Sequence, residues 1–175
     1  MNISLINLPE GGKSTVERQL AQRLKYDFID SDALIESRIG CSIRDFFASE
    51  GEDRFRDVEA EVLAASARRP RTVLATGGGA VIRPGNREIL HQATTVVYLR
   101  SSPEELFRRL RHDTQRPLLQ VADPLAKLRE LYAQRDPWYR EAAHFVVETG
   151  RPSVATLVNM ILMQLELSGT LPAEP

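Results

Sequence analysis

Short apolar runs alternate along this 175-residue chain with longer stretches in which apolar residues recur at helical spacing. The apolar runs predict five strands, near residues 3–6, 28–30, 73–75, 95–99 and 145–148. After the first run, Val16, Leu20 and Leu24 share one face of a predicted helix. Strands that alternate with helices are typical of a parallel sheet. We therefore expect an α/β fold with a five-stranded parallel sheet flanked by helices.

Capping residues set the boundaries of several predicted helices. Gly40 ends one helical pattern, and Ser42 precedes the next. Residues 102–105 read Ser-Pro-Glu-Glu, a capping box with proline at the first helical position. Another helix is predicted over 124–135. Residues 112–123 have no apolar period, which indicates a mobile loop between two helices.

The length and composition place the chain among globular proteins of one domain, expected over residues 1–170 with a tail at 171–175. The formal net charge of −1 gives no electrostatic reason to expect a nucleic acid or a membrane as partner. The sequence has no apolar run near the roughly 18 residues of a membrane span, and no signal-peptide pattern at its start. The single cysteine, Cys41, cannot form an internal disulfide and is expected to be buried. These features predict a cytoplasmic location.

The glycines after the first predicted strand indicate a phosphate-binding loop. Gly11-Gly12-Lys13-Ser14-Thr15 stands between a strand and a helix. In that position, backbone N–H groups and the helix N-terminus form a partly positive concavity that suits a polyphosphate. Lys13 is expected to reach the outer phosphates, and the Ser14 hydroxyl to bind Mg²⁺. Without a ligand, the same glycines would form a plain turn.

Two residues of this loop depart from the pattern Gly-x-x-x-x-Gly-Lys-Ser/Thr. Asn7 stands at the first glycine, and asparagine tolerates a positive φ better than other non-glycine residues. Glu10 places a carboxylate inside the loop. A phosphate about 4 Å from it would be repelled by roughly 1–4 kcal/mol per charge pair, unless the side chain points to solvent.

Two other segments carry candidate chemistry at predicted strand ends. Asp30 and Asp32 follow the second strand, where two carboxylates could hold a magnesium-bound water and orient an attacking hydroxyl. Alternatively, Asp32 could simply cap the next helix. Gly77-Gly78-Gly79 follows the third strand and would let backbone amides approach a ligand closely, or would form a plain turn.

Three arginines far apart in the sequence are candidates for anion binding. Arg56, Arg116 and Arg135 would each be read alone as surface residues. A planar guanidinium is, however, the natural partner of a carboxylate or a phosphate. A cleft that binds a small acid beside a phosphate donor would therefore require several of them.

The joint pattern of these motifs resembles the shikimate kinase family. In chain order the motifs are Lys13-Ser14-Thr15, Asp30-Ser31-Asp32, Gly51-Glu52-x-x-Phe55-Arg56-x-x-Glu59, Gly77-Gly78-Gly79, Arg116-Pro117-Leu118-Leu119 and Arg135-x-Pro137-x-Tyr139. The resemblance runs from about Ile3 to the terminal helix. Each motif alone is weak, whereas their order and spacing together are specific.

The resemblance implies a fold and a reaction. Members of this family transfer the γ-phosphoryl group of MgATP to the 3-hydroxyl of shikimate, on a P-loop sheet related to that of nucleoside monophosphate kinases. It implies a substrate-binding helical segment at about 32–62 and a lid at about 112–123. ATP and shikimate are the expected partners and Mg²⁺ the expected cofactor. A monomer is expected, since the terminal helix can pack on its own sheet.

The resemblance also implies catalytic and metal-binding roles. Lys13 would neutralise charge on the transferring phosphoryl group, and Arg116 on the lid would close over the phosphates. Ser14 would hold Mg²⁺, and Asp30 would reach the metal through water. Asp32 would bond the shikimate hydroxyl and orient it, or take its proton.

Substrate binding is implied for a further set of residues. Arg56 and Arg135, together with the amides of Gly78 and Gly79, would grip the carboxylate and ring hydroxyls of shikimate.

Nucleotide binding is implied for the loop from Gly11 to Thr15, and Arg109 is placed like the family arginine that stacks on adenine. Shikimate kinases normally carry glycine where this chain has Asn7, Glu10 and Glu17. Two alternatives therefore remain beside an active shikimate kinase. They are a catalytically weak or inactive relative that binds shikimate, and a P-loop kinase for another small hydroxy acid.

Overall fold

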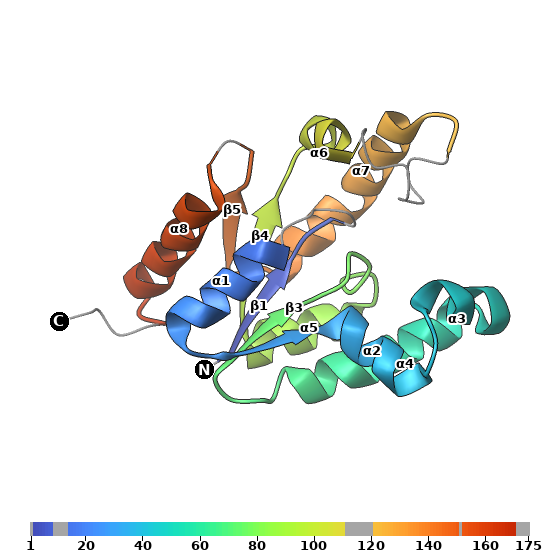
Figure 1. The fold of residues 1–175 in the computed structure, drawn as a ribbon, viewed down its shortest axis with the longest axis horizontal. Helices are drawn as coiled ribbons and strands as arrows, with labels where there is room; N and C mark the ends of the chain where they lie inside the picture. The colour runs from blue at the N-terminus through green and yellow to red at the C-terminus, as the bar shows by residue number, and fades with distance from the viewer. Residues whose placement is uncertain (1, 9–13, 111–120, 151, 171–175) are drawn as a thin grey trace.

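The computed structural model describes residues 2–8, 14–110, 121–150 and 152–170. Its centre is a five-stranded parallel sheet in the order β2-β3-β1-β4-β5 (Figure 1). The strands are β1 (Asn2–Ile6), β2 (Asp27–Asp30), β3 (Thr72–Ala75), β4 (Thr95–Arg100) and β5 (Phe145–Glu148). Because neighbouring strands all pair in parallel, their carboxyl ends meet at one edge, where sheets of this kind bind ligands. The predicted fold class is confirmed.

Helices follow every strand of the sheet. They are α1 (Ser14–Leu24), α2 (Ser31–Ile39), α3 (Ile43–Glu50), α4 (Glu52–Ser66), α5 (Pro84–Ala93), α6 (Pro103–Leu110), α7 (Pro124–Ala142) and α8 (Val154–Leu167). None of the helices in the described part of the chain is long and apolar enough to cross a membrane.

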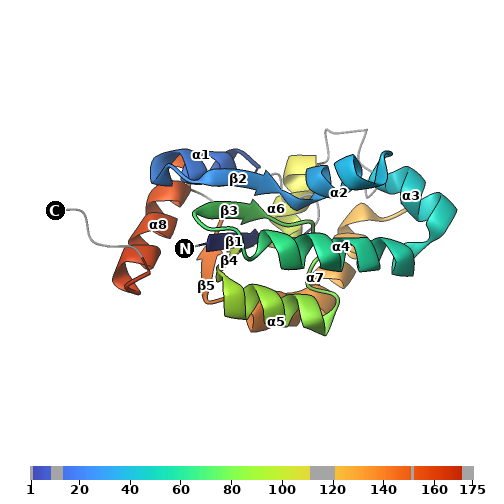
Figure 2. The same cartoon turned by 90° about the horizontal axis from the view of Figure 1, so that it is seen from below.

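Helices cover both faces of the sheet (Figure 2). On one face, α1 and α8 bury Val16, Leu20 and Ile161 against the strands. On the other face, α4, α5 and α7 pack over a second core that contains Tyr98 and Tyr139. A strand covered on both faces buries consecutive residues, which explains why the apolar runs located the strands correctly.

Helices α2, α3 and α4 pack on one another and extend beyond the sheet, on the right of Figure 1. Their small core contains Ile35, Phe55 and Val62. The predicted boundaries are confirmed: Gly40 ends α2 in a left-handed conformation with φ 75°, and the Ser42 side chain accepts a backbone N–H at the start of α3. The substrate-binding role of this segment stays a prediction.

Helix α7 is longer than the sequence predicts. The expected helix covers 124–135, but α7 continues through Pro137 to Ala142. Proline removes one helical hydrogen bond. The buried side chains Leu131 and Tyr139 on either side of it hold both halves of the helix against the core. Packing therefore outweighs the local preference.

The prediction that Cys41 is buried is wrong. Its side chain is exposed, because it lies in the three-residue turn between α2 and α3, directly after Gly40. An apolar side chain in so short a turn has no neighbouring layer to cover it.

Candidate active site

Asp30 and Asp32 have different structural roles at the carboxyl end of β2. Asp30 is the N-cap of α2, where its Oδ1 accepts the backbone N–H of Asp32 at 2.9 Å and that of Ala33 at 3.2 Å. The alternative that Asp32 is merely the cap is therefore wrong. With Asp30 satisfying the start of the helix, the Asp32 side chain lines a cleft instead.

The loop after β3 allows close approaches that a side chain would prevent. The N–H of Gly77 donates to the Ser31 hydroxyl at 3.2 Å. A Cβ on Gly77 would lie 2.5 Å from a carboxylate oxygen of Asp32, and a Cβ on Gly79 would collide with the guanidinium of Arg56. Glycine is thus required here for space rather than for a positive φ.

The Asp32 carboxyl group titrates close to neutral pH. Burial raises its pKa to about 6, and the carboxylates of Asp30, Glu59 and Glu36 act in the same direction. Arg56 opposes them. A pKa in this range suits a group that accepts a proton during a reaction.

Arg56 is held in the cleft by a buried acid. Its Nη1 lies 2.9 Å from Oε1 of Glu59, and both residues are buried on the same face of α4. The rings of Phe55 and Phe47 flank the guanidinium, with its carbon 5.1 Å and 5.8 Å from their centroids. The charge is therefore fixed in position before any ligand binds.

Helix α7 also contributes to the lining of this cleft. Arg135 lines it. One turn further along, the buried Tyr139 donates a hydrogen bond from its hydroxyl to the carbonyl oxygen of Gly78. Residues far apart in the sequence thus meet at one edge of the sheet.

The cleft has a volume of about 230 Å³. Its lining residues are Asp32, Ile43, Phe47, Phe55, Arg56, Glu59, Gly77, Gly78, Gly79 and Arg135. The structure therefore brings together all the residues for which the sequence predicts substrate binding. Charged groups and apolar side chains in one small cleft suit a ring that carries an acid and hydroxyl groups.

Two guanidinium nitrogens in this cleft lack a hydrogen-bond partner among the described residues. The Nε atoms of Arg56 and Arg135 are buried and have no hydrogen-bond partner among the described residues. A contact of 3.5 Å joins the Arg56 Nε to Glu52, which is too distant to count as a hydrogen bond. A buried N–H without a partner costs about 1–3 kcal/mol. An anion that engages both arginines would offset part of this cost.

The predicted nucleotide loop begins where β1 ends. Ser14 and Thr15 open α1, so the strand, glycine segment and helix follow in the predicted order. Residues 9–13, and with them Gly11, Gly12 and Lys13, lie outside the described part of the chain. Their roles stay predictions.

The lid and the adenine contact are also predictions. Arg116 and most of the lid lie outside the described residues. Arg109 lies on α6, where its Nη2 donates to the carbonyl of Thr149 at 3.1 Å. This contact joins α6 to the end of β5, away from the cleft lined by Asp32.

The start of α1 and the end of β2 offer donors for a hard cation. Glu17 is buried on α1; burial raises its pKa to about 8, and the Asp30 carboxylate adds to the increase. Carboxylate oxygens are the ligands that Mg²⁺ prefers, and a cation there would relieve this repulsion. The described residues contain no cluster of three or more acidic, His or Cys side chains that would enclose a metal. The few carboxylates near the start of α1 and the end of β2 fit Mg²⁺, because this ion usually takes its other ligands from water and phosphate.

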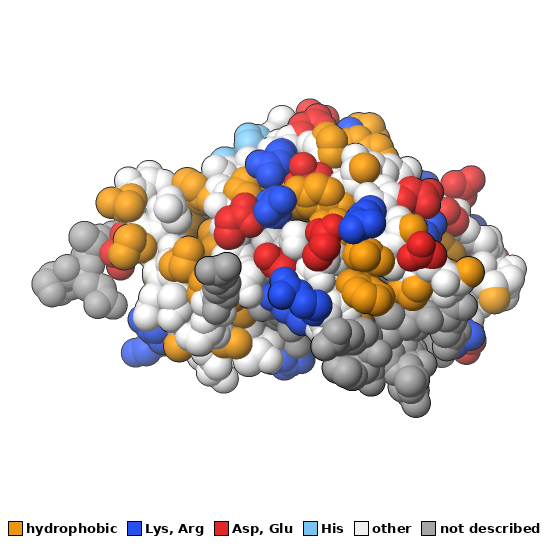
Figure 3. Space-filling model, turned by 90° about the horizontal axis from the view of Figure 1, so that it is seen from above, with side chains coloured by type: hydrophobic (Ala, Val, Ile, Leu, Met, Phe, Trp, Pro, Cys, Tyr) orange, Lys and Arg blue, Asp and Glu red, His pale blue; other side chains and the backbone are white. Residues whose placement is uncertain are grey.

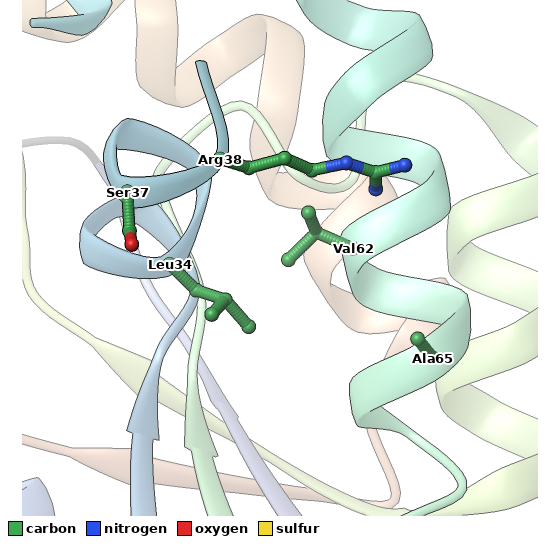
Figure 4. Close-up of a pocket in the computed structure, with 5 residues that line it drawn as sticks. All are labelled: Leu34, Ser37, Arg38, Val62 and Ala65. Carbon is green, nitrogen blue, oxygen red and sulfur yellow. The ribbon is translucent and has the colours of Figure 1, made fainter. Parts of the chain in front are cut away.

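A second cavity, of about 290 Å³, lies between α2 and α4 (Figure 4). It is lined by Leu34, Ser37, Arg38, Val62 and Ala65. Arg38 reaches across towards α4, where it pairs with Glu61 at 2.7 Å. This cavity is the larger of the two, but its lining has no carboxylate and no backbone loop that could orient a reacting group. The cleft at Asp32 is the candidate site.

Two residues of the site were not assigned a role from the sequence, although both occur in the quoted motifs. Glu59 could have been recognised because it stands three residues after Arg56 on a predicted helix. Tyr139 stands four residues after Arg135, but the helix was expected to end there. The predicted helix over 124–135 therefore did not place Tyr139 on the same helix face as Arg135.

The fold and the cleft together define a class of protein. In this parallel sheet, the central strand β1 is followed by a Gly-Gly-Lys-Ser-Thr segment and then by a helix. This order is the architecture of P-loop kinases. A cleft with two arginines and a carboxylate at the same sheet edge is suited to a small acidic substrate.

Comparison with known proteins identifies the family. The family model for shikimate kinase matches residues 11–166, and the chain belongs to the shikimate kinase family. It is 60% identical to a shikimate kinase of Paracidovorax citrulli (strain AAC00-1), over 100% of this chain and 97% of that relative. It is similar to the structure of a shikimate kinase from Acinetobacter baumannii in complex with shikimate, with a TM-score of 0.87, 47% identity, and coverage of 97% of this chain and 94% of that one.

A shikimate kinase structure from Aquifex aeolicus gives a TM-score of 0.84 at 31% identity, over 97% of this chain and 98% of that one. The predictions of the family and of an ATP-dependent kinase that phosphorylates shikimate are confirmed. The alternatives of an inactive relative and of a kinase for another acid are not supported.

Proposed function

We propose that Asp32, Arg56, Arg135 and the amides of Gly78 and Gly79 bind shikimate, and that Asp32 orients its 3-hydroxyl towards the γ-phosphoryl group of ATP. The observation that supports this most directly is that one cleft is lined by all five of these residues, from α2, α4, α7 and the loop after β3. Phosphoryl transfer needs positioning and charge neutralisation more than covalent chemistry from the protein.

Asp32 is proposed to receive the hydroxyl proton. With a pKa of about 6, its carboxylate is mostly ionised at neutral pH and accepts a hydrogen bond from the 3-hydroxyl. The hydroxyl oxygen then attacks the γ-phosphorus, the bond to the β-phosphate oxygen of ATP breaks, and the proton passes to Asp32. The products are ADP and shikimate 3-phosphate.

Arg56 and Arg135 are proposed to bind the substrate carboxylate. Both residues line the cleft, and each has a buried Nε without a hydrogen-bond partner among the described residues. The apolar side chains of Phe47 and Phe55 are expected to pack against the ring.

The phosphates are proposed to lie over the loop from Gly11 to Thr15, at the N-terminus of α1. Lys13 would neutralise the outer phosphates. Arg116, on the lid at about 112–123, would close over them and exclude water. Arg109 is proposed to stack on the adenine.

Magnesium is the proposed cofactor. Ser14 and Asp30 would hold it, Asp30 through water, near Glu17, whose pKa is raised by burial and by the Asp30 carboxylate. A magnesium ion held there would supply positive charge for the phosphates of ATP.

We further propose that residues 1–170 act as one domain and as a monomer in the cytoplasm, without nucleic acid or a membrane as partner. A net charge of −1 supports this, as does the face drawn in Figure 3, where basic and acidic side chains are interspersed.

A pair of arginine variants tests the substrate site. Arg56→Ala is expected to weaken shikimate binding about 10- to 100-fold in titration calorimetry, since it removes a charged hydrogen-bond donor. ADP binding should be retained. Arg38→Ala, which alters the second cavity, is the matched control and should bind shikimate normally. Normal shikimate binding by Arg56→Ala would refute the proposed site.

A further inference from the structure

Tyr139 is a fully buried residue that contacts the glycine loop of the proposed substrate site and has no role in the proposed function. Its hydroxyl donates a hydrogen bond to the carbonyl oxygen of Gly78. Its ring packs against the ring of Tyr98, with their centroids 4.9 Å apart. A buried polar contact therefore ties the loop after β3 to α7.

The Tyr139 hydroxyl also lies near the guanidinium of Arg135, which is proposed to bind the substrate carboxylate. Arg135 stands four residues before Tyr139, so both side chains share one face of α7. Burial raises the pKa of Tyr139, and the nearby guanidinium of Arg135 opposes this increase. The hydroxyl is thus close to two parts of the proposed substrate site, the arginine and the glycine loop.

The hydrogen bond to Gly78 orients more than one atom. In a trans peptide, the carbonyl of one residue and the N–H of the next point in opposite directions, and the described chain has no cis peptide bond. A Gly78 carbonyl that is held towards Tyr139 therefore turns the N–H of Gly79 the other way. That N–H has no hydrogen bond to another described residue, although Gly79 lines the cleft.

Glycine residues do not hold such an orientation by themselves. Three consecutive glycines have wide conformational freedom, and ordering them is costly in entropy. Four hydrogen bonds fix the loop. The Gly77 N–H donates to Ser31, the Ala80 N–H donates to the Gly77 carbonyl at 3.1 Å, the Ile82 N–H donates to the Gly79 carbonyl at 3.1 Å, and Tyr139 donates to the Gly78 carbonyl. Of these four, the Tyr139 bond is the one made to the peptide group between Gly78 and Gly79.

We propose that Tyr139 is a positioning residue for shikimate: its hydroxyl holds the Gly78 carbonyl so that the N–H of Gly79 is presented to the substrate. This inference rests on the proposed shikimate site. Tyr139 acts through the loop and does not itself touch the substrate.

Tyr98 provides a matched control. It is also fully buried and packs against the Tyr139 ring, but its hydroxyl donates to Oδ1 of Asp136 at 2.9 Å instead. This bond joins β4 to α7 and does not reach the glycine loop. Replacing either tyrosine by phenylalanine removes one buried hydroxyl and keeps the ring.

The experiment compares Tyr139→Phe and Tyr98→Phe with the unaltered protein. Tyr139→Phe is expected to raise both the KM and the Kd for shikimate about tenfold, the effect of one lost hydrogen bond. The kcat and the KM for ATP should change less than about threefold, because the lost interaction contributes equally to ground-state and transition-state binding. Tyr98→Phe should leave all these constants near their original values.

Two outcomes would overturn the inference. One is a shikimate KM that is unchanged in Tyr139→Phe, and the other is an equal increase in Tyr98→Phe, which would indicate a general loss of packing.

Arg56→Ala in the same assay distinguishes a failure of the Tyr139 inference from a failure of the proposed shikimate site. If Arg56→Ala loses shikimate binding and Tyr139→Phe does not, the role of Tyr139 alone is refuted. If Arg56→Ala binds normally, the site itself is refuted.

A second measurement tests the inference even if Tyr139→Phe lowers the stability of the protein. The chain has ten glycines, so selective ¹⁵N-glycine labelling gives a simple spectrum in which the Gly79 amide can be followed. Shikimate should shift this resonance in the unaltered protein and in Tyr98→Phe, and the shift should be much smaller in Tyr139→Phe. An equal shift in all three proteins would contradict the proposal.

Discussion

Arg56 and Glu59 form a buried ion pair on one face of α4, with 2.9 Å between Nη1 and Oε1. Glu59 is 1% exposed, so its charge depends on the arginine for compensation. Burial raises the pKa of Glu59, and Arg56 opposes that increase. The pair places a fixed positive charge at the wall of the proposed shikimate site.

Removing Glu59 is therefore expected to affect both stability and substrate binding. Glu59→Ala removes the closer, buried partner of the Arg56 guanidinium and leaves only the contact with Glu52 at 3.5 Å, which should lower the free energy of unfolding by up to about 3–5 kcal/mol. The KM for shikimate should rise as well, because Arg56 is no longer held in place. Urea unfolding and steady-state kinetics measure the two effects. Glu61→Ala breaks the exposed pair with Arg38 and should cost less than about 1 kcal/mol. Equal losses in both variants would contradict a special role for Glu59.

The pH dependence of the reaction should report Asp32. As the pH falls through about 6, its carboxylate becomes protonated and can no longer accept the hydroxyl proton. The kcat/KM for shikimate should therefore decrease about tenfold per pH unit below that value. Asp32→Asn should reduce kcat by roughly 10²- to 10⁴-fold and remove this limb. A profile that is flat from pH 5 to pH 7 would exclude Asp32 as the proton acceptor.

The space beside Gly79 is the next testable feature. A Cβ at this position would collide with the Arg56 guanidinium, so Gly79→Ala should displace the arginine at a cost of roughly 1–3 kcal/mol. Shikimate binding should weaken, as measured by calorimetry. Gly85→Ala is the control, because a Cβ there meets no atom within 4 Å in the first turn of α5. Its stability should stay the same or increase by up to about 1 kcal/mol.

Most of the fold could be predicted from the sequence because its signals are local. Apolar runs located the strands, and Gly40 and Ser42 marked helix ends correctly, since capping depends on neighbouring backbone groups. The sequence was misleading where distant contacts decide. The sequence predicts a helix over 124–135, but buried residues on both sides of Pro137 keep α7 intact to Ala142.

The candidate site could be predicted only in part. The sequence showed which residue types could bind an acidic substrate. It did not show that Asp32, Gly78 and Arg135 line one cleft, because the order of the strands in the sheet decides which loops meet. The difference between Asp30 and Asp32 also depends on geometry, since either aspartate could have capped α2. The contact from Tyr139 to Gly78 links two segments about sixty residues apart and has no local signal.

Glu17 should make the protein less stable as the pH rises. Its carboxyl group has an ordinary pKa of 4.5, which burial and Asp30 raise to about 8 in the folded state. The unfolded chain therefore releases this proton at lower pH than the folded chain does. The free energy of unfolding should fall between pH 4.5 and pH 8, by about 5 kcal/mol at most. Urea unfolding across this range should show a smaller decrease for Glu17→Gln, whereas Glu50→Gln, an exposed control at the end of α3, should keep the original slope. If Glu17→Gln keeps the full slope, the acid is not held neutral, and its burial beside Asp30 costs the fold little.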